Sequence, residues 1–205
     1  MKRIVSFLLA GALVLSLAAC GGKSNSMTKE EMLEVAEVVS VDEVSDAVNS
    51  NIVNAKQAYC GKVLEVQSAA FEIEEDRIDI GHFIVYLPEE DIAKIQKNQR
   101  ITVVGKTNDD IQTETSIALG GEEVELKNFV MEEAYLVTDR YEFTGTIWDW
   151  NTDFGAWDVK FPNDSYLKLV YFEDGTDVEQ YVGTEITFSA QVIDGDYYNA
   201  VITQQ

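Results

Sequence analysis

The residues whose types and spacing could do chemistry are concentrated in one acidic stretch, from Asp149 to Asp158. Asp149, Asn151 and Asp153 occupy its first, third and fifth positions. Side-chain oxygens at alternate positions of a loop can converge on one hard cation, and calcium is bound in this way. The spacing therefore predicts a candidate calcium site that uses these three residues together with Asp158.

The same stretch has an interpretation without a metal. Phe154 stands where a calcium loop needs glycine, and Lys160 stands where such a loop carries its bidentate glutamate. Asp, Asn and Gly are also the residues that turns prefer, so a hairpin loop between two strands explains them equally well. We therefore expect no cofactor, with calcium as the alternative.

Two tryptophans lie beside this stretch. A strand from Tyr141 to Trp150 would alternate its side chains between two faces, so Trp148 and Trp150 would share one face. If the opposite face, which carries Ile147, packs into a core, both tryptophans point outward. Aromatic rings beside carboxylates suit a sugar or a cationic group, through apolar contact, hydrogen bonding or cation-π attraction. The alternative is that these tryptophans are buried between two adjoining domains.

Catalytic motifs are missing from the sequence. His82 is the single histidine, and the chain has neither a Gly-x-Ser-x-Gly elbow nor a His-Glu-x-x-His helix. Gly120 and Gly121 lack the lysine and the spacing of a phosphate loop. A carboxylate pair could hydrolyse an envelope glycan, but the many acids give no way to choose the pair. We expect a non-enzymatic binding or interaction module, with a glycan hydrolase as a further alternative.

The first twenty residues have the pattern of an export signal. Lys2 and Arg3 precede an apolar run that ends at Leu17, and Leu17-Ala18-Ala19-Cys20 resembles the bacterial lipobox. The resemblance implies cleavage before Cys20 and lipidation of that residue, which would anchor the protein to the membrane of the bacterial cell envelope, facing outside the cytoplasm. Residues 1–20 are then the signal peptide and residues 21–27 a tether. An ordinary secretory signal is the alternative.

Charge and cysteine content limit the partners further. The chain has 15 Lys and Arg residues against 37 Asp and Glu residues, which gives a formal net charge of -22. Nucleic acid and anionic lipid headgroups would be repelled by this field, so we expect an envelope glycan, a peptide or a protein as the partner. With Cys20 lipidated, Cys60 has no partner for an intramolecular disulfide, and we expect it to be buried rather than reactive.

The spacing of apolar residues predicts helices first and strands afterwards. Capping patterns at Thr28 and Ser40 begin two helices in a segment that extends from Met27 to Tyr59. The period then changes to that of strands, with a short helix after Pro88. The predicted strands form two sets of five: Lys62–Ile73, Arg77–Ile80, His82–Leu87, Ile101–Gly105 and Phe129–Val137, then Tyr141–Trp150, Ala156–Phe161, Tyr166–Phe172, Glu185–Ile193 and Tyr197–Thr203.

In both sets three strands precede a helical turn and two strands follow it. This is the order of an OB-fold, so we predict a mainly β protein with an N-terminal helical segment and two small OB-like five-stranded Greek-key barrels. The helical segment and the first barrel would occupy residues 28–138, and the second barrel residues 139–205. An OB-fold binds ligands on its second and third strands and adjoining loops, which places Trp157 and Tyr166 near the binding surface.

A short segment at the end of the helical region carries a family resemblance. Asn54-Ala55-Lys56, Tyr59 and Gly61-Lys62-Val63, preceded by a helix and followed by the OB-like strand order, resemble the tRNA-anticodon-binding-like OB family found in many bacterial lipoproteins. The resemblance covers residues 41–138 and implies an OB-fold there. Family members often place a glycine in the first strand, where this chain has Ser68 and Ala69. The family name does not imply nucleic-acid binding, because a shared fold does not transfer function.

Overall fold

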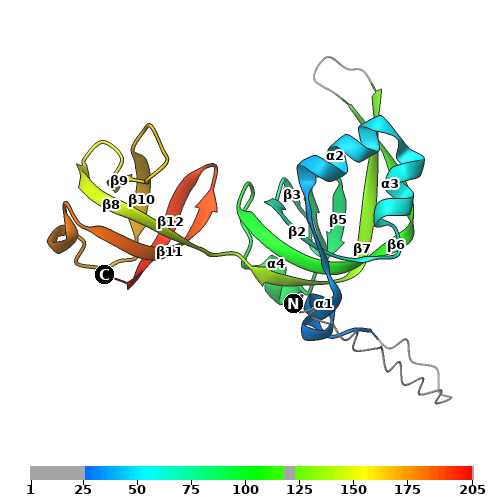
Figure 1. Cartoon of the computed structure of the whole chain (residues 1–205), viewed down its shortest axis with the longest axis horizontal. Helices are drawn as coiled ribbons and strands as arrows, with labels where there is room; N and C mark the ends of the chain where they lie inside the picture. Colours follow the sequence, from blue (N-terminus) through cyan, green and yellow to red (C-terminus); the bar gives the residue numbers. More distant parts are fainter. Residues whose placement is uncertain (1–25, 118–122, 205) are drawn as a thin grey trace, which may run out of the picture.

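The computed structural model describes residues 26–117 and 123–204. Its elements form two units that lie side by side, the first ending with β7 (Glu123–Thr138) and the second beginning with β8 (Tyr141–Asn151) (Figure 1). Each unit has a hydrophobic core of its own. The protein is mainly β with helices near its N-terminus, as predicted. The expected signal peptide, Cys20 and the Gly120-Gly121 pair lie outside the described residues.

The N-terminal segment contains three helices and one strand: α1 (Lys29–Val35), β1 (Glu37–Ser40), α2 (Val41–Ser50) and α3 (Ile52–Tyr59). Both predicted capping boxes are present, at Thr28 and Ser40. The first predicted helix does not continue to the second, because it ends at Val35 and residues 37–40 pair as a parallel strand with β2 (Val63–Ala69). Ser40, the N-cap of α2, accordingly has extended backbone. The second predicted helix is interrupted at Asn51, whose side chain caps α3.

The first unit contains a seven-stranded sheet in the order β1-β2-β6-β7-β5-β4-β3. Neighbouring strands are antiparallel except for the parallel pairs β1–β2 and β5–β7. A short helix, α4, precedes β6. The remaining elements are β2 (Val63–Ala69), β3 (Glu72–Ile73), β4 (Arg77–Ile80), β5 (Phe83–Tyr86), α4 (Glu89–Ile92), β6 (Arg100–Ile117) and β7 (Glu123–Thr138).

The first strand of this sheet is broken, whereas the sequence predicts one strand over 62–73. The Ala70 amide donates to the Gln99 carbonyl next to β6, and the Phe71 amide donates to the Asp79 carbonyl of β4. The chain therefore changes partner strands between two consecutive residues. In the strand order, β2 lies near one edge of the sheet and β3 forms the opposite edge. The sheet curls, so the short connection from β2 to β3 can link these two edges.

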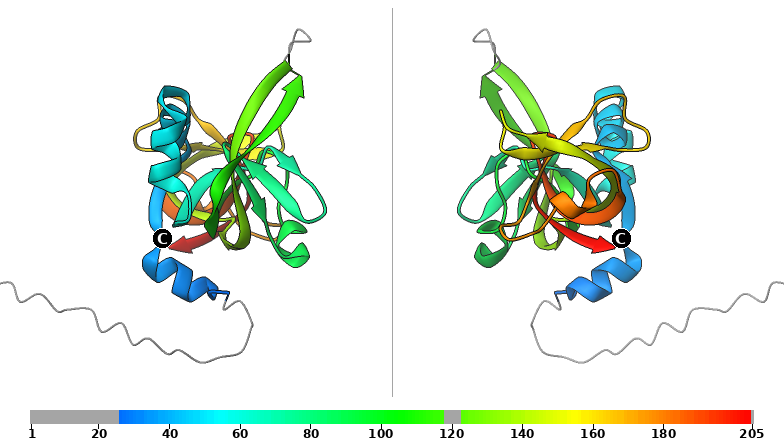
Figure 2. Two further views of the ribbon diagram at one scale, coloured as in Figure 1. Left: turned by 90° about the vertical axis from the view of Figure 1, so that its right-hand side faces the viewer. Right: turned by 90° about the vertical axis from the view of Figure 1, so that its left-hand side faces the viewer.

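The hairpin of β6 and β7 is longer than the sequence predicts. Pairing continues from Ile111 opposite Phe129 as far as Ile117 opposite Glu123. The polar residues between the predicted strands Ile101–Gly105 and Phe129–Val137 therefore lengthen both strands instead of forming a loop. The hairpin projects beyond the rest of the unit (Figure 2). We call the part of this hairpin from Ile111 to Phe129 the hairpin arm. The register of β6 against β7 shifts between Thr107 and Ile111, so the pairing is irregular where the hairpin arm leaves the sheet.

The second unit is a closed five-stranded barrel in the order β10-β12-β11-β8-β9. Strands β10 and β12 are parallel, and the other pairs are antiparallel. Gly145 is required where β8 crosses the core, because a Cβ atom there would lie 2.7 Å from Val159 Cγ1. The elements are β8 (Tyr141–Asn151), β9 (Ala156–Lys160), β10 (Lys168–Phe172), the 3-10 helix η1 (Glu179–Tyr181), β11 (Glu185–Ile193) and β12 (Asp196–Gln204).

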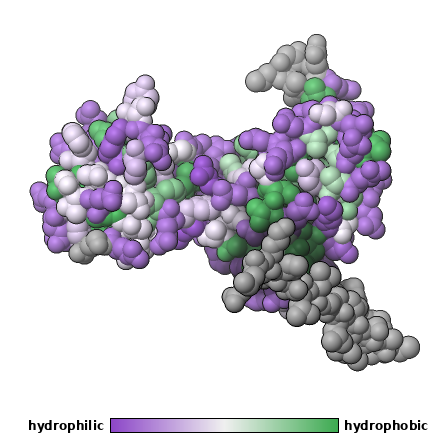
Figure 3. Space-filling model, viewed as in Figure 1, coloured by the Kyte–Doolittle hydropathy of each residue, from purple (hydrophilic) through white to green (hydrophobic). Residues whose placement is uncertain are grey.

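The two units touch at the junction between β7 and β8. Gln99 and Ile193 form an isolated β-bridge, and the hydroxyls of Thr102 and Tyr141 are 3.0 Å apart. The visible surface is mostly hydrophilic (Figure 3), in agreement with the net charge of -22. Within the ranges 26–117 and 123–204, no helix has the length and apolar character needed to span a membrane.

Candidate functional site

A β-bulge near the end of β8 decides where the tryptophans lie. Ile147 pairs with Val159 of β9, but two residues later Asp149 pairs with Asp158, only one residue further along β9. Trp148 is therefore an extra residue on β8. Side chains beyond it lie on the opposite face from the one that simple alternation gives.

The bulge brings Trp150 and Trp157 together. They pair directly across the two strands, and their ring centroids are 5.4 Å apart with an interplanar angle of 65°. Trp157 is half-buried and packs against the barrel core, whereas Trp150 is 45% exposed. The prediction that Trp148 and Trp150 share one face of β8 is therefore wrong. It assumed strict alternation after Ile147, and the extra residue at the bulge breaks that alternation.

The paired tryptophans line a cavity of about 350 Å³. This tryptophan pocket lies between the β8–β9 loop and the segment that leads from β10 to η1. Its base is apolar, since Val170 and Val178 belong to the barrel core. The lining residues are Trp150, Gly155, Ala156, Trp157, Val170, Tyr171, Phe172, Glu173, Asp174, Gly175, Thr176 and Val178.

The rim of the tryptophan pocket is acidic. Glu173 and Asp174 both contribute exposed carboxylates. The Arg140 guanidinium approaches from the junction between the units, with Nη1 3.7 Å from Glu173 Oε1. Among the described residues that line the pocket there is no lysine, arginine or histidine. The pocket therefore combines aromatic faces with negative charge.

One wall is stiffened by a tyrosine stack. Tyr171 of β10 and Tyr198 of β12 have ring centroids 4.6 Å apart and are nearly parallel, with an angle of 1° between the rings. Burial, followed by the neighbouring Tyr171, raises the pKa of Tyr198. A tyrosine phenol is protonated at neutral pH even without this shift, so Tyr198 adds no negative charge.

The other two predicted aromatic residues lie outside the pocket. Trp148 is 62% exposed and Tyr166 is 80% exposed, and neither lines the cavity. The alternative that the β8 tryptophans are buried between the two units is wrong, because both Trp148 and Trp150 expose a large part of their side chains.

Two of the four predicted calcium ligands, Asn151 and Asp158, contact each other through their side chains. The Asn151 amide nitrogen lies 3.3 Å from both carboxylate oxygens of Asp158, and Asn151 Oδ1 accepts from the Asp153 amide. Asp149 accepts a 2.8 Å hydrogen bond from the Trp150 amide. In the part of the chain that the structure describes, no group of three or more His, Cys, Asp and Glu side chains is arranged to hold a metal ion. These contacts are those of a hairpin loop.

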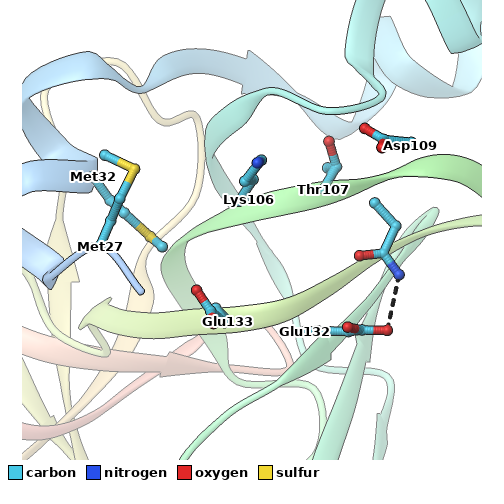
Figure 4. Close-up of a pocket in the computed structure, with 8 residues that line it drawn as sticks. Met27, Met32, Lys106, Thr107, Asp109, Glu132 and Glu133 are labelled. Atoms are coloured by element: carbon cyan, nitrogen blue, oxygen red, sulfur yellow. Dashed lines mark hydrogen bonds between the residues drawn. The ribbon is translucent and has the colours of Figure 1, made fainter. Parts of the chain in front are cut away.

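A second cavity, of about 430 Å³, lies beside α1 in the first unit (Figure 4). The thioethers of Met27 and Met32 lie at one end and the Asp109 carboxylate at the other. Lys106 is placed among the acids, and Glu132 accepts a 3.0 Å hydrogen bond from the Asn108 side chain. The cavity is lined by one lysine and three acidic residues, so its charge is negative and partly neutralised by Lys106.

Sequence reasoning missed the acidic rim and the cavity beside α1. Glu173 and Asp174 follow β10 and read as ordinary turn residues before Gly175. Their position next to Trp157 depends on the pairing of β9 with β10, which the sequence does not give. His82, the single histidine, has Nδ1 3.0 Å from the Lys127 carbonyl, which is a structural contact to β7.

Comparison with known proteins does not supply an identity. No family model matches the chain. No curated protein matches it significantly. The functional proposal therefore rests on the fold and on the geometry described above.

Proposed function

We propose that this protein is a membrane-anchored lipoprotein that faces outside the cytoplasm and acts as a non-enzymatic binding module. The observation that carries the proposal is the tryptophan pocket of the second unit, with Trp150 and Trp157 in contact above an apolar base. Concave sites lined by aromatic residues, with a few polar groups at the rim, are the usual form of small-ligand sites.

The strand connectivity supports an OB-like fold for both units, residues 28–138 and 139–205. In the second unit the third and fifth strands are parallel neighbours, and η1 lies between the third and fourth. In the first unit β5 and β7 are the equivalent parallel pair, and α4 occupies the place of η1. This repetition agrees with the resemblance to the tRNA-anticodon-binding-like OB family.

The position of the pocket supports a binding role. OB-folds use their second and third strands and the loop between the first two strands to bind ligands. Here these elements are β9, β10 and the β8–β9 loop, and they supply half of the residues that line the pocket. The net charge of -22 argues against nucleic acid as the ligand.

Membrane attachment through Cys20 rests on the sequence pattern alone. We expect the wild-type chain to incorporate labelled palmitate in bacteria and to fractionate with membranes. Cys20→Ser should abolish the label. Retention of the label in the variant would overturn the proposed anchor.

Ligand binding is tested with the full chain in detergent micelles. Envelope glycan fragments and peptides are screened by tryptophan fluorescence, and each hit is repeated with Trp150→Ala and Trp148→Ala. Trp150→Ala should weaken binding because it removes one wall of the pocket. Trp148→Ala is the matched control, since Trp148 is a neighbouring tryptophan that is more exposed than Trp150 but lies outside the pocket. Hits that survive Trp150→Ala unchanged would contradict this site.

A further inference from the structure

We propose that the ligand of the tryptophan pocket presents a small organic cation, an alkylammonium or guanidinium group, to the exposed ring surface of Trp150 and to Glu173. This inference rests on the proposed binding function and specifies the chemical class of the ligand. It does not depend on membrane attachment or on the first unit.

The tryptophan pocket combines aromatic rings with negative charge. A cation gains energy over the face of a tryptophan, because the ring has a negative electrostatic face, and tryptophan is the best aromatic residue for this contact. Trp150 and Trp157 pack edge to face with ring centroids 5.4 Å apart, so a cation would lie against the ring surface that Trp150 leaves exposed rather than between the two rings. Glu173 and Asp174 add carboxylates at the same rim. A neutral sugar would use the rings but would gain no ion pair from these acids.

Glu173 already has a guanidinium partner in Arg140, which does not itself line the pocket. Arg140 Nη1 is 3.7 Å from Glu173 Oε1, and the two side chains are 30% and 51% exposed. Partly exposed ion pairs are weak, so a ligand cation can replace this contact at small cost. Arg140 also donates to the carbonyls of Ser189 and Asn199. These two hydrogen bonds would keep Arg140 at the junction if the Glu173 carboxylate exchanged its contact with Arg140 for one with a ligand cation.

The size of the site agrees with a small head group. The cavity of about 350 Å³ is open at its rim and closed at its base by Val170 and Val178. A trimethylammonium group, an amino sugar or the end of a lysine side chain can enter such a space. The shared chemistry of these sources is a cation attached to aliphatic carbon.

The test uses two probes of nearly the same shape, choline and its neutral counterpart 3,3-dimethyl-1-butanol, with the full chain in micelles. Binding is followed by tryptophan fluorescence and calorimetry. Choline should bind about tenfold more tightly than the alcohol, and its affinity should fall as sodium chloride is raised. Equal affinities for both probes would overturn the cationic class.

Two charge variants distinguish binding in the tryptophan pocket from non-specific attraction of a cation by the protein's net negative charge. Glu173→Gln should lower choline affinity about fivefold without changing that of the alcohol, because only the cation loses an ion pair. Glu179→Gln is the matched control, since it removes the same charge from an exposed residue outside the pocket. Equal losses in both variants would mean non-specific attraction and would overturn the proposal.

Arg140→Gln provides the opposite change. Removing the internal guanidinium should raise choline affinity, because Glu173 is then available, and should leave the alcohol unaffected. Thermal unfolding of each variant shows that the barrel is intact, and if Arg140→Gln unfolds, Glu173→Gln decides the question alone.

Two further probes identify the source of the cation. D-Glucosamine represents amino sugars, and Nα-acetyl-lysine amide represents peptides. If choline and both of these fail to bind, the cationic class is wrong. A neutral glycan that binds and depends on Trp150 would in that case leave the proposed binding function standing.

Discussion

The Gln191 side-chain amide donates a 2.7 Å hydrogen bond to the Asp139 carboxylate. Asp139 lies between β7 and β8, and Gln191 lies on β11 of the second unit. From the first unit, the buried Gln99 side chain lies 3.4 Å from the Asp139 carbonyl and 3.5 Å from its carboxylate. The residue that connects the units is therefore held from both sides, which limits how far they can swing.

We expect Asp139→Ala to loosen this junction. The change removes the acceptor of the Gln191 amide and the longer carboxylate contact of Gln99, which keeps the Asp139 carbonyl as its acceptor. The loss should cost about 1–3 kcal/mol of unfolding free energy. Chemical denaturation measures the loss, and X-ray scattering in solution should show a wider range of separations between the units. Asp46→Ala, at an exposed position on α2, is the control. Unchanged scattering would mean that other contacts hold the junction.

Two glycines test whether the units unfold separately. A Cβ atom on Gly105 would lie 2.7 Å from Ala134 Cβ, and one on Gly145 would lie 2.7 Å from Val159 Cγ1. Each alanine substitution should destabilise its own unit by about 1–3 kcal/mol through overpacking. Hydrogen exchange should then show faster opening of the first unit in Gly105→Ala and of the second in Gly145→Ala. Equal acceleration throughout the chain would show a single cooperative unit.

The parts of the fold that depend on local chemistry could be predicted from the sequence. The capping boxes at Thr28 and Ser40 involve residues three positions apart, and both are present. Strands with strong alternation, such as β11 over 185–193, also have the predicted bounds. The hairpin arm was missed because its polar residues resemble a loop until they pair with each other across β6 and β7.

The candidate site could be predicted only in part. Trp150 and Trp157 were identified as binding residues, but the bulge at Trp148 that brings them together depends on the register of two strands. The same register separates Trp148 from the pocket. Glu173 could not be predicted as a site residue because it is distant from Trp157 in the sequence. Only the pairing of β9 with β10 brings the two residues to the same pocket.

Cys60 provides a prediction about pH. The thiol is half-buried, and burial, followed by the charge of Asp110, raises its pKa, while Lys56 acts in the opposite direction. Because the thiolate is the reactive form, alkylation by iodoacetamide should be slower than for the unfolded chain at the same pH and should rise only at higher pH. The raised pKa also stabilises the fold below the unfolded-state pKa, and this contribution is lost as the pH rises through the folded-state pKa.

The rate of alkylation across pH 7 to 11 measures this shift. Asp110→Asn should move the profile toward lower pH, because it removes a negative charge that disfavours the thiolate. Asp46→Asn, a substitution of the same kind on α2, should leave the profile unchanged. A wild-type profile that coincides with that of the unfolded chain would contradict the effect of burial.

The last prediction concerns calcium at the β8–β9 loop. We expect the melting temperature of the full chain to be the same in chelator and in millimolar calcium, since the Asn151 side chain is occupied by Asp158 and by the Asp153 amide. An ion that bound only the folded state would raise the melting temperature in proportion to RT ln(1 + [L]/Kd). Asp149→Ala and Asp153→Ala serve as controls. A rise of several degrees with calcium, absent in both variants, would show that the loop rearranges into a calcium site.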